Sequence, residues 1–340
     1  MTAPLASDTK PLRDFAAPRV SGRLEASDLG LVINIADPYS VEVGEFYAKA
    51  RGLESAQVLR VVLPMGRALV AAEFESLSAR IQAHFGADIQ ALALAWNQPY
   101  AVGCQSITGA LALGLDSGLC ERSCAPTKPS PYFNSASSRP WSELRMRPSM
   151  LLAAADVQGA RALIERGIAA DGSLGWRGAP PVRAHFVVTR DALRSVRSVL
   201  YPPSAFLRRY GVEVTAGSDG ASVDPDRVLL YLTGVAQVPD LRRLNFVPGA
   251  LADHMTSFGG QLDGSGAQTS ARAWLDAGAT ASYGTVSEPC NHLEKFPHPQ
   301  ALLLHYLQGS TAIEAYWKSV AWPSQGVFIG EPLAAPFARP

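Results

Sequence analysis

The stretch GLVINIADPYSVEVGEFYAKARGLESAQVLRVVL, residues 30–63, decides the fold class. Its short β-branched run, residues 31–35, ends at Asp37-Pro38 and is typical of a buried strand. A helix over 41–51 follows, which Ser40 can cap and Gly52 can end. Residues 58–63 form the next strand. Strand, helix and strand in this order make a βαβ unit, so the sequence predicts a parallel sheet covered by helices on both faces.

The same alternation continues along the chain. Helices are expected over residues 67–85, 157–170 and 191–200, and strands over 89–96, 150–155, 185–189, 212–214 and 228–232. The last third adds a partly apolar run at 251–257, helices over 270–276 and 299–308, a helix capped by Ser310 or Thr311, and strands over 279–286 and 326–330. We therefore predict an extended leader, residues 1–29, and then one large α/β domain, residues 30–340, whose sheet stays parallel to its last strand.

Residues 98–148 interrupt this pattern. They are rich in Ser, Pro, Gly and Asn, and they hold three of the four cysteines. A long irregular stretch inside a compact chain is usually functional or held by cross-links. We expect this segment to be an insertion in the α/β domain.

The composition excludes several classes of partner. Thirty basic and thirty acidic residues cancel, so no overall field attracts nucleic acid or anionic lipid. No apolar run is long enough to cross a membrane, and residues 1–12 do not form a signal-peptide pattern, which leaves the cytoplasm open as a location. The one local excess of charge is basic, over residues 183–209, and is typical of a solvated surface with exposed ion pairs.

The four cysteines are Cys104, Cys120, Cys124 and Cys290. An even count favours two disulfides, for which three pairings are possible. Four reduced thiols in a cytosolic protein are the alternative. A zinc site is the third option, although the three-residue spacer between Cys120 and Cys124 is a weak signal for it.

One arrangement in the sequence suits nucleophilic chemistry. Cys290 follows a predicted strand, and the carboxyl ends of parallel strands are where sites gather. A thiol becomes a nucleophile as thiolate and needs a nearby base, which His254 at another possible strand end would supply. Ser257, beside Gly259-Gly260, would place a hydroxyl near backbone N–H groups. A disulfide at Cys290 and a buried, hydrogen-bonded His254 are the structural alternative.

A second polar cluster surrounds Phe296-Pro297. Glu288, His292 and His298 offer the donor types of a metal site, and a solvated loop is the other explanation. The fingerprints of dinucleotide-binding and P-loop proteins, of HExxH metalloenzymes and of α/β-hydrolases are absent. The sequence therefore identifies no cofactor.

The last third resembles a known group of proteins. Residues 277–286 (AGATASYGTV), 307–317 (LQGSTAIEAYW) and 327–333 (VFIGEPL) are similar, in this order, to the closing segment of caspase-like proteins such as gingipains and CHAT domains. The chain more closely resembles an uncharacterised bacterial family that accompanies the exosortase (PEP-CTERM) sorting system. The residues that match that family's N-terminal pattern are Asn34, Asp37, Pro38, Ser40, Tyr47, Ala48, Arg51 and Leu53.

This resemblance implies a caspase-like three-layer sandwich. It also implies that the usual catalytic pair is missing, because residues 231–234 (YLTG) lack a His-Gly and residues 254–260 (HMTSFGG) lack a Cys at the expected strand ends. The expectation is a periplasmic or secreted cell-envelope protein that binds a protein or peptide partner. The alternatives are a cysteine hydrolase using Cys290 with His254, and a metal-dependent enzyme using Glu288, His292 and His298.

Overall fold

The computed structural model describes residues 15–218, 223–264 and 267–339. An eleven-stranded sheet and a small three-stranded sheet organise this part of the chain. The strands are β1 (Leu29–Asn34), β2 (Val58–Val61), β3 (Ala68–Leu69), β4 (Ala91–Leu94), β5 (Ala101–Val102), β6 (Gln105–Ser106), β7 (Ser149–Leu151), β8 (Val182–Val188), β9 (Ala205–Leu207), β10 (Val212–Ser218), β11 (Val228–Gly234), β12 (Phe246–Met255), β13 (Ala281–Thr285) and β14 (Gly326–Gly330).

The α-helices join several of the strands, although none lies between β8 and β12 among the described residues. They are α1 (Pro38–Arg51), α2 (Ala71–His84), α3 (Ile107–Leu113), α4 (Pro140–Leu144), α5 (Val157–Ala170), α6 (Arg272–Asp276), α7 (Pro299–Leu307) and α8 (Ala312–Trp317). The predicted helix over 191–200 is instead a 3-10 helix, Ser195–Leu200.

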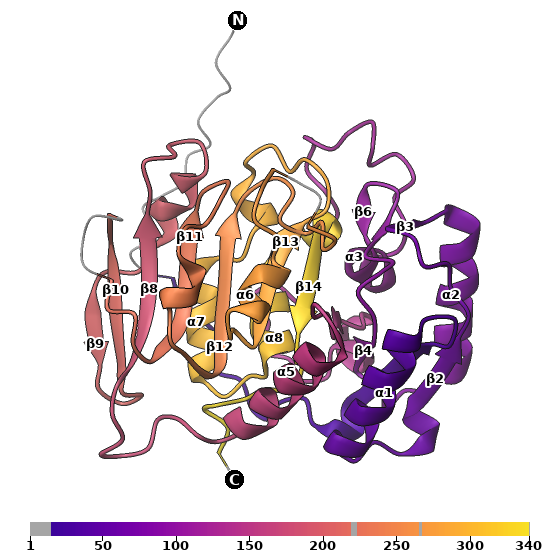
Figure 1. Cartoon of the computed structure of the whole chain (residues 1–340), viewed down its shortest axis with the longest axis horizontal. Coiled ribbons are helices and arrows are strands. Elements are labelled where there is room, and N and C mark those ends of the chain that lie inside the picture. Colours follow the sequence, from indigo (N-terminus) through magenta and orange to yellow (C-terminus); the bar gives the residue numbers. More distant parts are fainter. Residues whose placement is uncertain (1–14, 219–222, 265–266, 340) are drawn as a thin grey trace, which may run out of the picture.

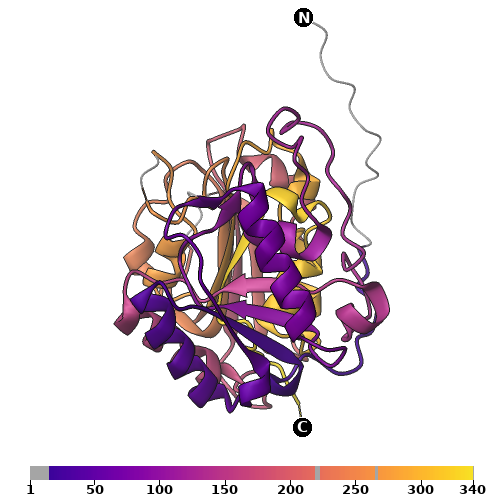
Figure 2. The same cartoon turned by 90° about the vertical axis from the view of Figure 1, so that its right-hand side faces the viewer.

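The large sheet joins two halves edge to edge. Its strand order is β2-β1-β4-β7 for the first half and β14-β13-β12-β11-β8-β10-β9 for the second, with β7 and β14 in contact. Helices α5 and α6 lie in front of the strands in Figure 1, and α7 and α8 lie behind them. Figure 2, turned by 90°, places α6 and the yellow C-terminal helices on opposite sides of the strands. The predicted three-layer α/β architecture with a mostly parallel sheet is confirmed.

Burial on both faces explains the near-continuous apolar strands. Every residue of β1, β4 and β7 is buried. On β1, Leu31 and Ile33 pack in the same core cluster as Val43 of α1, whereas Val32 packs in the cluster of Phe74 and Leu77 of α2. Strands covered in this way lack the alternation of half-exposed strands.

The expectation that the sheet stays parallel to its end is wrong for β14. This strand pairs antiparallel with β13, with Thr285 opposite Gly326. The reason is the two-helix connection. The His298 N–H, before α7, donates to the carbonyl of Ser319, after α8, and the Ala312 N–H at the start of α8 donates to Ala334 O, beyond the end of β14. Helix α7 thus leads the chain away from the sheet edge at which β13 ends, and α8 leads it back to that edge. Strand β14 therefore starts where β13 ends and runs in the opposite direction.

The motif residues near α1 have structural roles. Asp37, rather than Ser40, caps α1 by accepting from the Tyr39 N–H, while Ser40 Oγ accepts from the Asn34 N–H inside the fold. Glu331, fully buried after β14, binds Arg51 through two hydrogen bonds of 2.9 and 2.7 Å and accepts a third from the Tyr47 hydroxyl. This clasp of Tyr47, Arg51 and Glu331 ties the first helix to the last strand.

The leader and the insertion both pack against the body. The first 14 residues of the predicted leader lie outside the described residues, and residues 15–25 contain no helix or strand. The Val20 and Leu24 N–H groups donate to Gln308 and Glu314. The predicted insertion contains β5, β6, α3 and α4 joined by irregular segments.

Candidate functional site

The carboxyl edge of the second half is where a site is expected. Strand β8 is followed by β10 on one side, whereas β11 lies on its other side, so the strand order reverses at the β8–β11 boundary. In open α/β sheets, ligands bind at the carboxyl ends of strands next to such a reversal. The loops after β8, β11, β12 and β13 therefore form the candidate site.

The loop after β8 is packed tightly onto the end of β11. Thr189 Oγ1 donates to the carbonyl of Gly234 at 2.5 Å and is also within 3.0 Å of Ser195 Oγ. A Cβ atom on Gly234 would lie 1.9 Å from the carbonyl oxygen of Arg194, so a side chain there would displace the loop. The crevice between β8 and β11 is thus filled by the protein's own residues.

A chain of polar contacts continues from this loop to the end of β12. Arg194 pairs with Asp191 at 2.9 Å and donates through Nε to Thr256 Oγ1 at 3.2 Å. Thr256 donates to Gln268 Oε1, which also accepts from the Phe258 N–H. These contacts hold the segment after β12 in one arrangement.

A buried ion pair lies beneath this surface. Arg197 Nη1 is 2.6 Å from Asp253 Oδ1, and both side chains are almost fully inaccessible to solvent. Arg197 also donates to the carbonyl of Thr233 at 2.9 Å, which joins the ends of β11 and β12. Burial raises the pKa of Asp253 above its usual value, while the guanidinium of Arg197 opposes that shift.

His254 lies on β12 beside this pair and is buried. Its Nδ1 accepts from the indole N–H of Trp274 at 2.9 Å, and the ring also lies beside the backbone of Thr269. Burial, aided by Arg197 and Arg194 and opposed by the backbone contact with Thr269, lowers the pKa of His254 to about 3, so the imidazole is neutral at pH 7. A buried ring with so low a pKa is a weak base, so it is poorly suited to take a proton from a thiol.

Cys290 is joined to Cys124, and Cys104 to Cys120; the Cα–Cα separation is 5.1 Å in each pair. These bonds use all four cysteines of the chain. The Cys290 N–H donates to Glu288 Oε1. Of the three options that the sequence left open, disulfides are the one present. No contact in the described part of the chain joins Cys290 to His254.

Ser257 follows β12 and is half-buried. Its carbonyl, rather than its hydroxyl, has the defined contact, accepting from Thr285 Oγ1 at 2.9 Å. The Gly259-Gly260 backbone lies against Gly284 so closely that a Cβ on Gly260 would be 2.5 Å from the Gly284 carbonyl oxygen. The double glycine therefore allows two loops to pack together.

The predicted metal ligands do not converge, which corrects that reading of the sequence. His292 Nε2 contacts the carbonyl of Cys124, His298 stacks on Phe15, and Glu288 caps the turn at Cys290. Within residues 15–218, 223–264 and 267–339, no three His, Cys, Asp or Glu side chains are grouped to hold a metal ion. Each of the three side chains contacts a different segment: His292 contacts Cys124, His298 contacts Phe15, and Glu288 contacts Cys290.

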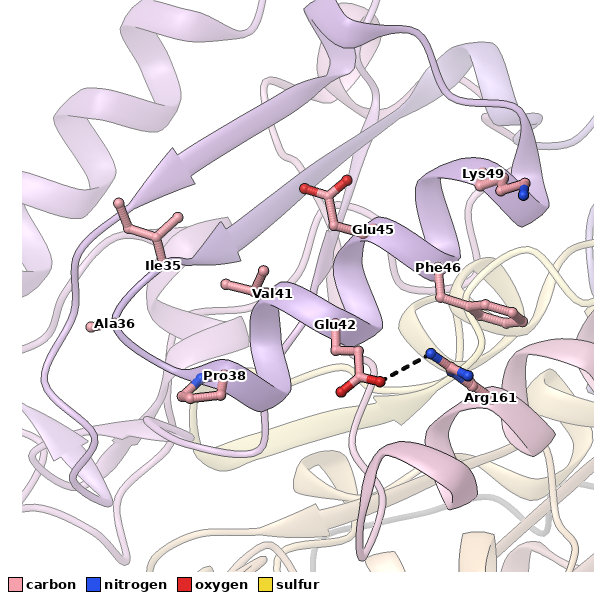
Figure 3. Close-up of a pocket in the computed structure, with 9 residues that line it drawn as sticks. All are labelled: Ile35, Ala36, Pro38, Val41, Glu42, Glu45, Phe46, Lys49 and Arg161. Atoms are coloured by element: carbon pink, nitrogen blue, oxygen red, sulfur yellow. Dashed lines mark hydrogen bonds and ion pairs between the residues drawn. The ribbon is translucent and has the colours of Figure 1, made fainter.

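The first half has a shallow pocket at the carboxyl end of β1, shown in Figure 3. Apolar side chains of the loop after β1 and of α1 form much of it. Glu42 pairs with Arg161 at 3.0 Å, and the Arg161 guanidinium lies over the ring of Phe46. Glu45 pairs with Arg60. Both carboxylates of the pocket are thus neutralised within the protein.

The sequence did not indicate that an arginine of this region is buried. Arg197 belongs to the basic run that was expected to be a solvated surface, yet it pairs with Asp253 inside the fold. Only Asp253, a carboxylate within the apolar run 251–257, gave a signal that a counter-charge must exist.

Taken together, the reversal of strand order, the mostly parallel sheet and its antiparallel strand β14 describe an α/β fold of the caspase-like kind. The fold is similar to the crystal structure of the Arg-specific cysteine proteinase gingipain R (RgpB), with a TM-score of 0.51. That comparison covers 92% of this chain and 78% of the other at 10% sequence identity, so it concerns the fold alone. No protein-family model and no curated protein matches the chain.

Two further observations bear on the cellular compartment of the protein. Paired disulfides are typical of proteins that fold in oxidising compartments. Among the described residues, no helix is both long enough and apolar enough to span a bilayer.

Proposed function

We propose that this chain is a caspase-like scaffold without peptidase activity, which acts by binding a protein or peptide. The observation that carries the proposal is that all four cysteines form disulfides. A cysteine hydrolase needs a thiolate, and a disulfide sulfur does not supply one. The strand ends at Thr233-Gly234 and His254-Met255 offer no other Cys–His pair.

The cell-envelope setting belongs to the same proposal. Two disulfides favour the periplasm or the cell exterior. The sequence resemblance to the exosortase-associated family favours a bacterial cell envelope and is the sole support for that finer statement.

A cysteine hydrolase that uses Cys290 with His254, assisted by Ser257, is the rival proposal. The similarity of the fold to a cysteine proteinase favours it. It requires the Cys124–Cys290 bond to open, and it requires the buried His254 ring to reach the freed thiol.

One variant separates the two proposals. Cys124→Ser releases Cys290 as a thiol, and Cys290→Ser releases Cys124 as the matched control. With fluorogenic peptides of varied sequence, we expect neither variant nor the unmodified protein to hydrolyse substrate above the buffer rate. Iodoacetamide should label no thiol in the unreduced, denatured wild-type protein. Hydrolysis by Cys124→Ser alone, abolished by adding His254→Gln, would establish the hydrolase instead.

A further inference from the structure

A groove lies at the amino edge of the sheet, opposite the candidate site, and its charged side chains are all arginines. Its wall includes Arg19, Arg209, Tyr210, Gln308, Phe337 and Arg339, and its volume is about 650 Å³. Arg209 and Tyr210 lie between β9 and β10, Gln308 follows α7, and Phe337 and Arg339 belong to the C-terminal segment. We call this the arginine groove. The end of the C-terminal segment that contributes to it is marked C in Figure 1.

Among the residues that the structure describes, the three arginines of the groove have no acidic partner. No carboxylate lines the groove, and no ion pair joins any of the three to an Asp or Glu in the part of the chain that the structure describes. Other arginines of the same basic run are neutralised, Arg183 by Asp224 and Arg194 by Asp191. In a chain with no net charge, the groove is a local concentration of positive charge.

Arg339 is held in place by neutral groups. Its Nη2 donates to the carbonyl of Leu174 at 2.8 Å, and its guanidinium lies over the ring of Trp176, 4.6 Å from the centroid. Gly175 has a φ of +75°, and a Cβ there would lie 2.5 Å from Arg339 Nη2, so the glycine makes room for the guanidinium. These contacts fix the side chain and leave its charge uncompensated.

The rest of the groove is also ordered by contacts within the protein. The Val20 N–H donates to Gln308 Oε1 at 3.1 Å, which fixes the backbone next to Arg19. The Arg209 guanidinium lies 5.5 Å from the centroid of the Tyr210 ring, and that ring packs edge-on against Phe337. An anion would therefore meet preorganised donors beside aromatic surface.

We propose that the arginine groove binds an acidic peptide segment. Guanidinium groups bind carboxylates through paired hydrogen bonds, which suits Asp and Glu side chains. The apolar wall, which includes Leu304 and Leu307, would contact apolar residues between the acidic ones. A single inorganic anion would leave this wall unused. This inference rests on the proposed function, in which the protein acts by binding, and it names the chemical class of the partner.

The test is binding of a fluorescent peptide in which Glu alternates with Leu or Phe, measured by anisotropy at low salt. Because guanidinium–carboxylate pairs between exposed groups are screened, we expect affinity to fall steeply as salt rises. Arg209→Glu and Arg19→Glu should each weaken binding at least about tenfold, since each replaces attraction with repulsion. The peptide with Gln in place of Glu should bind poorly.

Arg190→Glu is the matched control. Arg190 is an exposed arginine beyond the carboxyl end of β8, at the other edge of the sheet, and the same charge change there should leave affinity within about twofold. Equal effects of Arg190→Glu and Arg209→Glu would overturn the inference while leaving a binding function intact. Tighter binding of a single-stranded oligonucleotide than of the acidic peptide would overturn the assigned class. Cleavage of the peptide by the wild-type protein would contradict the proposed function itself.

Discussion

At the scale of single residues, the pair of Arg197 and Asp253 is the most consequential charge interaction. Both groups are buried at the carboxyl ends of β11 and β12. Arg197→Met would leave the Asp253 carboxylate without its counter-charge, and we expect unfolding free energy to fall by about 3–5 kcal/mol in urea titrations. The double variant Arg197→Met with Asp253→Leu should lose less than the single one, because no unpaired charge stays buried.

An exposed pair provides the control for this prediction. Asp240 and Arg243 lie 3.4 Å apart and are both largely solvent-accessible. Asp240→Asn should change the unfolding free energy by less than about 0.5 kcal/mol. A similar loss at both sites would mean that Arg197 and Asp253 are not buried together.

His254 gives a second prediction at this scale. Burial lowers its pKa to about 3 in the folded protein, against about 6.5 in the unfolded chain. The unfolded state therefore binds more protons between these values, and stability decreases as pH falls below about 6.5. We expect His254 to account for about 2 kcal/mol of stability lost between pH 7 and pH 5.

Comparison of variants isolates this contribution. Denaturant titrations give the free energy of unfolding at pH 7 and at pH 5. In His254→Gln, the decrease in this free energy between the two pH values should be smaller than in the wild-type protein by about 2 kcal/mol. His84→Gln makes the same substitution at an exposed position in the last turn of α2 and is the control. If the pH dependence of stability in His254→Gln equals that of the wild-type protein, folding does not lower the pKa of His254.

At the scale of elements, the clasp between α1 and the segment after β14 decides how the two halves are joined. Glu331→Gln keeps the shape of the side chain but removes the charge that Arg51 and Tyr47 bind. We expect it to cost about 2 kcal/mol, since Arg51 is largely buried but keeps its second acidic partner, Asp171. Tyr47→Phe removes one hydrogen bond and should cost about 1 kcal/mol.

Thermal or urea unfolding of both variants checks this order. Arg60→Gln breaks the exposed pair with Glu45 and is the matched control, with an expected change below about 1 kcal/mol. If Glu331→Gln is no more damaging than Arg60→Gln, the clasp does not hold the two halves together.

The elements also show what the sequence can and cannot predict. The apolar run at 31–35 predicts β1 because a strand buried on both faces is apolar throughout. The helical period of 157–170 predicts α5 because a helix buried on one face repeats its apolar residues every turn. The position of β14 was predicted in the same way. Its direction was not, because α7 and α8 reverse the chain through tertiary contacts such as that of Ala312 with Ala334, which leave no mark in a periodicity.

The candidate site was less predictable for the same reason. The sequence placed Cys290, His254 and Ser257 at strand ends, where the structure also has them. It did not indicate which cysteine Cys290 would meet, because the partner is 166 residues away. The cap of α1 is Asp37 and not the predicted Ser40, because the Ser40 hydroxyl accepts a hydrogen bond from the Asn34 N–H inside the fold.

At the scale of the whole molecule, the predicted insertion, residues 98–148, is tied to the second half by more than one contact. Cys124 is bonded to Cys290, Ser287 Oγ donates to the carbonyl of Cys104 at 2.6 Å, and Lys295 Nζ donates to the carbonyl of Ser123 at 2.5 Å. The Lys295 side chain is buried, which lowers its pKa to about 8. The irregular segment is therefore anchored to the loop after β13.

The two disulfides should contribute unequally to stability. A cross-link restricts the unfolded chain more when it closes a longer loop, and Cys124–Cys290 spans 166 residues whereas Cys104–Cys120 spans 16. The chain-entropy relation gives about 5 kcal/mol for the first bond and about 3 kcal/mol for the second. The double variant Cys124→Ser with Cys290→Ser should therefore have a lower melting temperature than the double variant Cys104→Ser with Cys120→Ser under non-reducing conditions.

Peptide mapping without reductant should first recover the pairs Cys104–Cys120 and Cys124–Cys290. Any other pairing, or the reverse order of melting temperatures, would contradict the anchoring of residues 98–148.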